Sequence, residues 1–383
     1  MKILDQWTHV NFAGSSEAKL NQNYMRFESA LKLLLDGKDD QAIELLKEIY
    51  ISDEESLKQS TANLLFDLWF SQSKWDAIKK YGFIENEMIE KDNRLIAAAS
   101  GQFAPRAITF GINEFSIPMN LSSTGSPIIE VSVNGNKKEF WLDTGAGMTV
   151  ISSSFAEACQ LSHSQIAFEI GASTDENYSS TLACIEKLDI GNVSIQNQPS
   201  LVLDDELLII QHPVTQSIIK IDGIIGWDII KDLTLELDYK NRILTAKEPK
   251  SISNSNPNLI FCGYPIVKLT SANMEPLIFG IDTGAQHTHF GESLTQKMLG
   301  LKTVKKKLHA GGVGGFKEVE VDQLEHLLLY LDNHPLEVSH IRKVLVDYAT
   351  FFKLDGVLGS DCFQEQRLML DYPNRKLEIH SSE

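Results

Sequence analysis

The feature that most constrains this chain is an internal duplication centred on two short motifs. Asp143-Thr144-Gly145 and Asp282-Thr283-Gly284 each follow an apolar run, each precede Ala, and each have a Thr six residues after the Asp. A single Asp-Thr-Gly is most often a surface turn, because all three residue types are common in turns. Two copies with matched surroundings instead indicate one structural unit that occurs twice.

The match between the two copies extends well beyond the tripeptides. Before them stand Gly125-Ser126-Pro127-Ile128 and Gly263-Tyr264-Pro265-Ile266. After them come Asp222-Gly223-Ile224-Ile225-Gly226 and Asp355-Gly356-Val357-Leu358-Gly359. Each copy then ends on Leu-Asp-Tyr, whose Asp, Asp238 or Asp371, lies 12 residues past the last Gly. We expect these four additional aspartates to be turn or partner residues and not acids of a mechanism.

The paired acids indicate catalysis by two carboxyl groups that share one proton. Two carboxylates brought face to face cannot both ionise cheaply, so one acts as a base toward water and the other as an acid toward a carbonyl. Gly145 and Gly284 would permit close backbone approach, and the neighbouring Thr hydroxyls would orient the loops. The apolar runs 139–142 and 277–281 are typical of buried strands that lead into each Asp.

These motifs resemble the retropepsin-like aspartic proteases, in particular bacterial relatives that carry two lobes in one chain. The resemblance covers roughly residues 116–383 and rests on the motifs quoted above. It implies two β-rich acid-protease lobes with Asp143 and Asp282 as the catalytic pair where the lobes meet. It also implies that Thr144 and Thr283 cross-brace the two loops, and that the segments ending in Gly226 and Gly359 support them.

A glycine-rich segment in the second copy is a candidate flap over the cleft. Residues 309–316 contain Gly311, Gly312, Gly314 and Gly315 between expected strands. A cleft of this kind needs a mobile cover that excludes water. A phosphate-binding loop would need a following helix with Lys and Ser or Thr, whereas apolar alternation continues here. The corresponding residues 168–174 are less glycine-rich, so we expect the second flap to be the more mobile one.

No metal or organic cofactor is expected. His287 and His289 follow Asp282 at strand spacing, but two histidines without a third nearby ligand are a weak signal for a metal site. We expect them to be ordinary side chains that line or flank the cleft. The four cysteines fall two in each copy without a CxxC pair, so one disulfide per lobe is possible, although free thiols are the more common outcome.

The first hundred residues follow a different pattern. Apolar residues recur at three- and four-residue spacing over residues 24–35 and 41–49, and the first proline is Pro105. This spacing predicts amphipathic helices. Segments 36–42 and 73–77 resemble the turns of tetratricopeptide helix pairs, which implies a helical domain that holds a protein partner or substrate. Packing against the lobes is the simpler alternative.

The chain therefore divides as a multidomain α+β protein. We expect an all-α domain at 1–105, a first lobe at 115–250 and a second at 257–383, with a linker from 99 to about 113. The formal net charge of −17 argues against nucleic acid and anionic membranes as partners, because their phosphates would be repelled. The N-terminus lacks the apolar segment of a signal peptide, which favours the cytoplasm unless a leader has been removed.

The expected function is that of a monomeric aspartic endopeptidase acting on a peptide or protein substrate. Asp143 and Asp282 would activate a water molecule between them. An inactive peptide-binding scaffold built on the same lobes is the alternative from another functional class. A third arrangement keeps the chemistry but pairs lobes between two chains.

Overall fold

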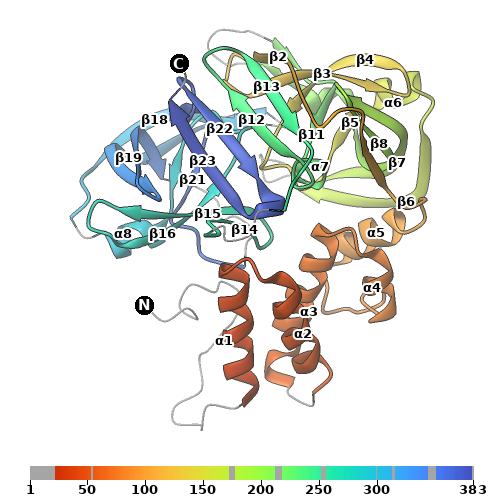
Figure 1. Cartoon of the computed structure of the whole chain (residues 1–383), viewed down its shortest axis with the longest axis horizontal. Helices are drawn as coiled ribbons and strands as arrows, with labels where there is room; N and C mark the ends of the chain where they lie inside the picture. The colour runs from red at the N-terminus through yellow and green to blue at the C-terminus, as the bar shows by residue number, and fades with distance from the viewer. Residues whose placement is uncertain are drawn as a thin grey trace.

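The fold is known from a computed structural model that describes residues 22–52, 55–171, 177–211, 218–251, 256–298, 300–312, 315–343 and 351–381. It is α+β, with a helical region at residues 22–100 followed by two β-rich lobes, as the sequence predicts (Figure 1). We call the strands from Ala107 to Lys247 the first lobe and those from Leu259 to Ser381 the second lobe. None of the helices in the described part of the chain combines the length and apolarity needed to cross a bilayer.

The helical region consists of successive helices, two pairs of which are joined by tight turns. Its helices are α1 (Gln22–Leu35), α2 (Asp39–Tyr50), α3 (Glu55–Ser71), α4 (Trp75–Lys80) and α5 (Lys91–Ser100). The first two match the predicted periodic segments. The α1–α2 and α3–α4 turns have the same geometry, with a left-handed residue at Gly37 (φ 68°) and Ser73 (φ 55°). After it, the Lys38 and Lys74 N–H groups each bond a carbonyl 2.8 Å away on the preceding helix.

The first lobe is built from short strands and two short helices. Its elements are β1 (Ala107–Phe110), β2 (Glu114–Leu121), β3 (Pro127–Val133), β4 (Asn136–Leu142), β5 (Val150–Ser152), α6 (Ser153–Ala158), β6 (Ser162–Gly171), β7 (Asn177–Ile190), β8 (Val193–Leu203), β9 (Ile209–Gln211), β10 (Ile218–Lys220), β11 (Gly223–Ile225), α7 (Trp227–Ile230), β12 (Thr234–Asp238) and β13 (Ile243–Lys247). Strand β1 pairs with β8 inside the segment expected to be a linker. That expectation was therefore wrong for residues 107–110, because the pairing partner lies far along the chain.

The second lobe repeats this plan. Its elements are β14 (Leu259–Phe261), β15 (Pro265–Ser271), β16 (Pro276–Ile281), β17 (His289–Phe290), α8 (Glu292–Lys297), β18 (Thr303–Gly312), β19 (Gly315–Leu331), β20 (His334–Lys343), β21 (Gly356–Leu358), β22 (Gln366–Asp371) and β23 (Lys376–Ser381). The strand order β15-β16-β21-β17-β20-β19-β18 corresponds to β3-β4-β11-β5-β8-β7-β6. In both, the strand before the Asp-Thr-Gly runs parallel to the strand of the aliphatic-Gly segment. The duplication inferred from sequence is thus a duplication of topology.

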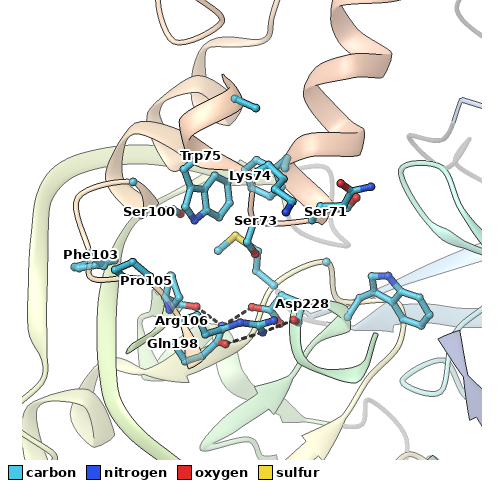
Figure 2. A pocket seen from close by; sticks show the side chains of 18 of the residues that line it. Ser71, Ser73, Lys74, Trp75, Ser100, Phe103, Pro105, Arg106, Gln198 and Asp228 are labelled. Atoms are coloured by element: carbon cyan, nitrogen blue, oxygen red, sulfur yellow. Dashed lines mark hydrogen bonds between the residues drawn. The ribbon is translucent and has the colours of Figure 1, made fainter. Parts of the chain in front are cut away.

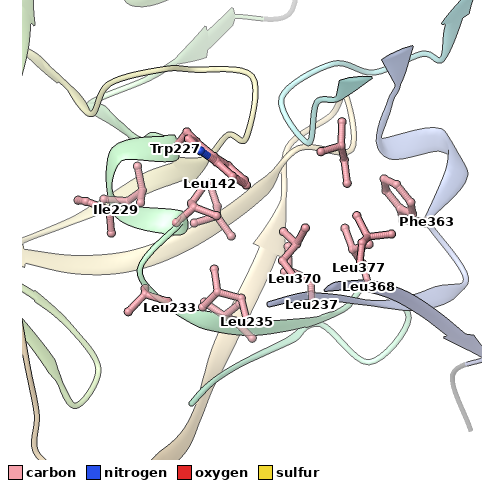
Figure 3. Packing of buried hydrophobic residues seen from close by; sticks show 14 of the residues in the cluster. Leu142, Trp227, Ile229, Leu233, Leu235, Leu237, Phe363, Leu368, Leu370 and Leu377 are labelled. Carbon is pink, nitrogen blue, oxygen red and sulfur yellow. The ribbon is translucent and has the colours of Figure 1, made fainter. Parts of the chain in front are cut away.

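The two copies are joined through their Leu-Asp-Tyr segments. Strand β12 pairs antiparallel with β22, so that Leu235 lies opposite Leu370 and Leu237 opposite Leu368. These leucines are buried and pack with Trp227, Phe363 and Leu377 in one continuous core (Figure 3). A shared sheet and a shared core hold the lobes in a defined relative position, which a site made from both lobes requires.

The helical region rests on both lobes. On the second lobe, Arg375 Nη2 forms an ion pair with Asp39 Oδ2 at 2.6 Å, and apolar residues of α1–α3 cluster with the β14–β16 face. On the first lobe, Ile96 and Ala99 of α5 pack against Phe168 and Leu182, which belong to the β6–β7 hairpin. The helical region therefore contacts both of the lobes that carry the candidate acids (Figure 1).

Candidate active site

Each candidate acid lies where a buried strand ends. Asp143 follows β4 and its N–H donates to Ile225 O at 3.0 Å. Asp282 follows β16 and its N–H donates to Leu358 O at 2.9 Å. The aliphatic-Gly strands β11 and β21 therefore lie directly beside the two loops, as the sequence analysis expected. A backbone held on a buried strand positions its carboxylate more rigidly than a free loop does.

The two Thr residues brace one loop against the other across the lobe junction. Thr144 N–H donates to Thr283 Oγ1 at 3.1 Å, and Thr283 N–H donates to Thr144 Oγ1 at 3.0 Å. Their hydroxyls then donate to Ile281 O at 2.8 Å and Leu142 O at 2.7 Å in the opposite lobe. Both side chains are fully buried. Loss of either hydroxyl would leave buried polar groups unpaired, so this arrangement fixes the distance between the loops.

The loop backbone orients each carboxylate in the same way. Gly145 and Ala146 N–H groups donate to Asp143 Oδ1 at 2.8 and 3.3 Å. In the other lobe, Gly284 and Ala285 N–H groups donate to Asp282 Oδ1 at 3.0 and 2.8 Å. In both loops Oδ1 is therefore held by the backbone, which leaves Oδ2 as the oxygen free to interact elsewhere.

The glycines are required because the carboxylate of the opposite lobe packs against them. A Cβ added to Gly145 would lie 2.6 Å from Asp282 Cγ, and one added to Gly284 would overlap Asp143 Oδ2. The two half-buried carboxyl groups thus face each other across the junction. Burial, followed by the nearby charge of Asp282, raises the pKa of Asp143 well above its ordinary value. This is the behaviour of two acids that cannot both ionise at close range.

Tyr264, a residue that the sequence pattern did not mark as part of the site, contacts the pair of acids. Tyr264 Oη donates to Asp282 Oδ2 at 2.9 Å, and the Tyr264 side chain is only 9% exposed. At the matching position of the first lobe, Ser126 Oγ instead donates to Gly284 O at 3.0 Å. The signal was present in the aligned Gly-Ser-Pro and Gly-Tyr-Pro segments, which differ only at this residue. Nothing local in the sequence showed that the phenol reaches an acid 18 positions away.

The Thr six residues after each Asp forms hydrogen bonds that connect the Asp loop to neighbouring segments. Thr149 Oγ1 donates to Asp228 Oδ1 at 2.8 Å, and Thr288 Oγ1 donates to Asp361 Oδ1 at 2.7 Å. Each Thr hydroxyl also accepts an N–H from the Gly of the neighbouring strand, Gly226 or Gly359. The motif Thr is therefore a connector between the Asp loop, the aliphatic-Gly strand and the turn that follows it.

The four other repeated aspartates lie away from the pair, in structural roles. Asp355 is fully buried and accepts from Ile278 N–H, Ser293 Oγ and Lys297 Nζ. Asp222 is near the surface beside Lys138 and Lys220. Asp238 accepts from Asn241, and Asp371 accepts from Thr234 and Asn374.

The histidines and cysteines do not gather with the pair. His287 Nδ1 lies 3.7 Å from Asp361 Oδ2. Burial lowers the pKa of His289 to about 4. Over the described ranges of the chain, no three His, Cys, Asp or Glu side chains cluster in a way that would hold a metal ion. All four cysteines are free and buried.

The flap candidates lie at a hairpin end. Gly311 and Gly312 are the last residues of β18 and Gly315 is the first of β19, with Gly311 opposite Phe316 and Gly312 opposite Gly315. Gly314 lies outside the described residues. The equivalent hairpin of the first lobe is formed by β6 and β7. Both hairpins therefore occupy matching places in their lobes.

A comparison with known protein families finds a match in the first lobe. Residues 129–229 match a family model described as aspartyl protease, and this range includes Asp143, Thr144 and the β11 segment. A search of curated proteins finds no match. Asp282 lies outside the matched range, and the repeated topology and the reciprocal Thr bonds place its loop opposite that of Asp143. The match, taken with this geometry, supports an aspartic protease family for the chain.

Proposed function

We propose that the chain is an aspartic endopeptidase of the retropepsin-like, single-chain, two-lobed type. The observation that carries the proposal is the pair of Asp-Thr-Gly loops, which are locked together by reciprocal Thr hydrogen bonds. They present two carboxylates to each other from opposite lobes. Such an arrangement needs no metal or organic cofactor, because the acids themselves supply the base and the proton donor.

The hydrogen bonds around the pair support different roles for the two acids. Asp282 faces three donors, from Gly284, Ala285 and Tyr264, whereas two backbone N–H groups face Asp143. Donors stabilise the charged form of a carboxyl group. We therefore infer that Asp143, whose pKa is raised, holds the shared proton and acts as the acid, and that Asp282 acts as the base.

The mechanism follows from this assignment. Asp282 accepts a proton from a water molecule held between the carboxyl groups as that water attacks the peptide carbonyl. Asp143 donates its proton to the carbonyl oxygen, on which negative charge would otherwise develop. As the C–N bond of the tetrahedral intermediate breaks, Asp282 donates the proton taken from water to the leaving nitrogen. Asp143 takes back a proton from the hydroxyl group as the carbonyl re-forms. Activity should follow a bell-shaped pH profile that belongs to the pair as a unit.

The test is a peptide-library digest by wild type, Asp143→Asn and Asp282→Asn. Each variant should lose at least about 1,000-fold in kcat/KM, because general acid–base catalysis by a positioned carboxyl is of that order. Circular dichroism should show an unchanged fold, and a statine-type inhibitor should bind wild type at one molecule per chain. Turnover retained in either variant would contradict the proposal. Peptide binding by wild type without any cleavage would favour an inactive scaffold instead.

A further inference from the structure

A large cavity lies where the helical region meets the first lobe. Its volume is about 800 Å³, within the range of about 300–1,000 Å³ that is typical of ligand sites. Figure 2 shows Ser73 and Lys74 of the α3–α4 turn and Trp75 at the start of α4 on one side, and Arg106, Gln198 and Asp228 on the other. The cavity can accommodate several residues of a peptide.

The cavity adjoins the Asp143 loop and the β14–β15 turn. Gly147 and Met148, four and five residues after Asp143, form part of its wall. Gly263, which precedes the Tyr264 that bonds Asp282, forms another part. Four residues of extended chain span at most about 14 Å, so the Gly147 wall lies within that distance of Asp143. An extended substrate bound at the acids would reach the cavity with about four residues.

The β6–β7 hairpin of the first lobe is fastened beside the cavity. Asp92 Oδ1 of α5 accepts from Glu169 N–H of β6 at 2.9 Å. Met148, which lines the cavity, packs in the same cluster as Phe168 of that hairpin. A peptide that passed beneath the β6–β7 hairpin would therefore emerge beside the cavity.

The chemistry of the walls favours a cation. Aromatic side chains surround the space, among them Phe70, Trp75 and Phe261, and aromatic rings attract positive charge. The partly buried Asp67 of α3 lines the same space and has no hydrogen-bond or ion-pair partner within the described part of the chain. A half-buried carboxylate without a partner is costly and is characteristic of a binding site.

The basic residues of the cavity do not neutralise this carboxylate. Arg106 is already engaged by Gln198 Oε1, by Asp228 O at 2.6 Å and by an ion pair with Asp232. Lys74 lies at the rim and is exposed, so its ammonium group can remain in water. Neither Arg106 nor Lys74 therefore balances the negative charge of Asp67 inside the cavity.

We propose that this cavity binds an extension of the peptide substrate, with a lysine or arginine side chain about four residues from the scissile bond paired to Asp67. The proposal rests on the proposed peptidase function and adds a substrate preference to it. The helical region then forms one wall of the substrate site, in addition to packing against the lobes.

The experiment uses the full chain and paired peptides that differ in one residue, Lys or Gln, placed in turn three, four or five residues on either side of the cleaved bond. Wild type should cleave one Lys peptide at least about 10-fold faster in kcat/KM, mainly through a lower KM. Asp67→Asn should cleave the paired peptides alike. Asp40→Asn, which removes an exposed acid of α2 remote from the cavity, should retain the preference. Equal cleavage of all pairs by wild type, or a preference retained by Asp67→Asn, would overturn the proposal.

A binding measurement separates failure of this proposal from failure of the peptidase function. Fluorescence anisotropy of the same labelled peptides with Asp143→Asn should show tighter binding of the Lys peptide, and the double variant with Asp67→Asn should lose that difference. If wild type cleaves nothing but this Lys-dependent binding is found, the cavity assignment holds and the peptidase function fails. If wild type cleaves peptides but binding does not discriminate Lys from Gln, the cavity assignment fails alone.

Discussion

The two lobes share a backbone plan but treat their acids differently. The loops receive matching N–H donors, and matching Thr residues brace them. At the residue between Gly and Pro, however, the first lobe has Ser126, which bonds a backbone carbonyl, and the second has Tyr264, which bonds Asp282. A symmetric scaffold thus holds an asymmetric pair. Because the backbone bonds are symmetric, this single side chain is the difference between the two sites: it gives Asp282 a hydrogen-bond donor that Ser126 does not give Asp143.

A second difference concerns the aspartate before each aliphatic-Gly strand. In the first lobe Asp222 retains 19% side-chain exposure and lies 3.3 Å from Lys138. In the second lobe the equivalent Asp355 is fully buried and forms an ion pair with Lys297 at 2.7 Å. Equivalent positions in a repeat therefore need not carry equivalent energies, because burial determines how much an ion pair matters.

The largest expected effect tests this second difference. Asp355→Asn should lower the free energy of unfolding by about 3–5 kcal/mol, because it leaves the buried Lys297 ammonium without its partner. Asp222→Asn should lower it by less than about 1 kcal/mol, as is usual for exposed pairs. Urea denaturation of both variants measures the comparison directly. Equal losses would show that the lobes are energetically equivalent here.

The next effect tests the symmetry of the two Asp-Thr-Gly loops. Gly145→Ala and Gly284→Ala should each lower kcat about 100-fold, because the added Cβ displaces the carboxylate of the opposite lobe. Gly147→Ala is the matched control, since a Cβ there meets nothing within 4 Å, and it should lose far less. Steady-state kinetics with one short peptide decide the matter. A large loss in only one of the two glycine variants would contradict a shared dependence on both loops.

A smaller effect tests the asymmetry created by Tyr264. Tyr264→Phe removes a hydrogen bond to the charged form, so kcat/KM should fall about 10-fold and the acidic limb of activity should move to higher pH. Tyr239→Phe makes the same chemical change at a fully buried tyrosine whose hydroxyl has no hydrogen-bond partner in the described structure. It should leave the pH profile in place. An unshifted acidic limb in Tyr264→Phe would remove the basis for placing the charge on Asp282.

The smallest effect concerns the helical region. This region occurs once in the chain, whereas the lobe occurs twice, so it is a third departure from two-fold symmetry. Burial raises the pKa of Asp67 from 3.8 to about 7. A carboxyl group whose pKa is higher in the folded state binds more protons there, so the free energy of unfolding should fall as pH rises from about 4 to about 7. Asp67→Asn should remove this contribution and stabilise the chain by about 1 kcal/mol or more at pH 8.

Thermal unfolding of wild type and Asp67→Asn across pH 4–8 measures this contribution. The two curves should diverge with rising pH and run parallel above about pH 7. A variant that is less stable than wild type at pH 8 would mean that Asp67 already has a partner. If removing the Asp67 carboxylate stabilises the protein, the residue is retained for binding and not for folding.

Much of the fold could be predicted because its signals are local or repeated. Spacing of apolar residues located α1 and α2, and the strands leading into Asp143 and Asp282 were visible as short apolar runs. The strand β1 was missed, because a four-residue strand between a helix and a lobe has no periodicity long enough to detect and depends on β8 for its pairing. Segments 36–42 and 73–77 were identified as related, and both form the same helix turn.

The sequence by itself determined the duplication, and with it the pair of acids, the bracing Thr residues and the glycines beside them. These could be inferred because each lobe independently repeats the same local hydrogen bonds, and a repeated pattern is visible without knowing the fold. Only the tertiary structure placed Tyr264 on Asp282 and Asp67 in a cavity beside the Asp143 loop. Those contacts are made once, between segments whose separation in sequence carries no pattern, so packing alone decides them.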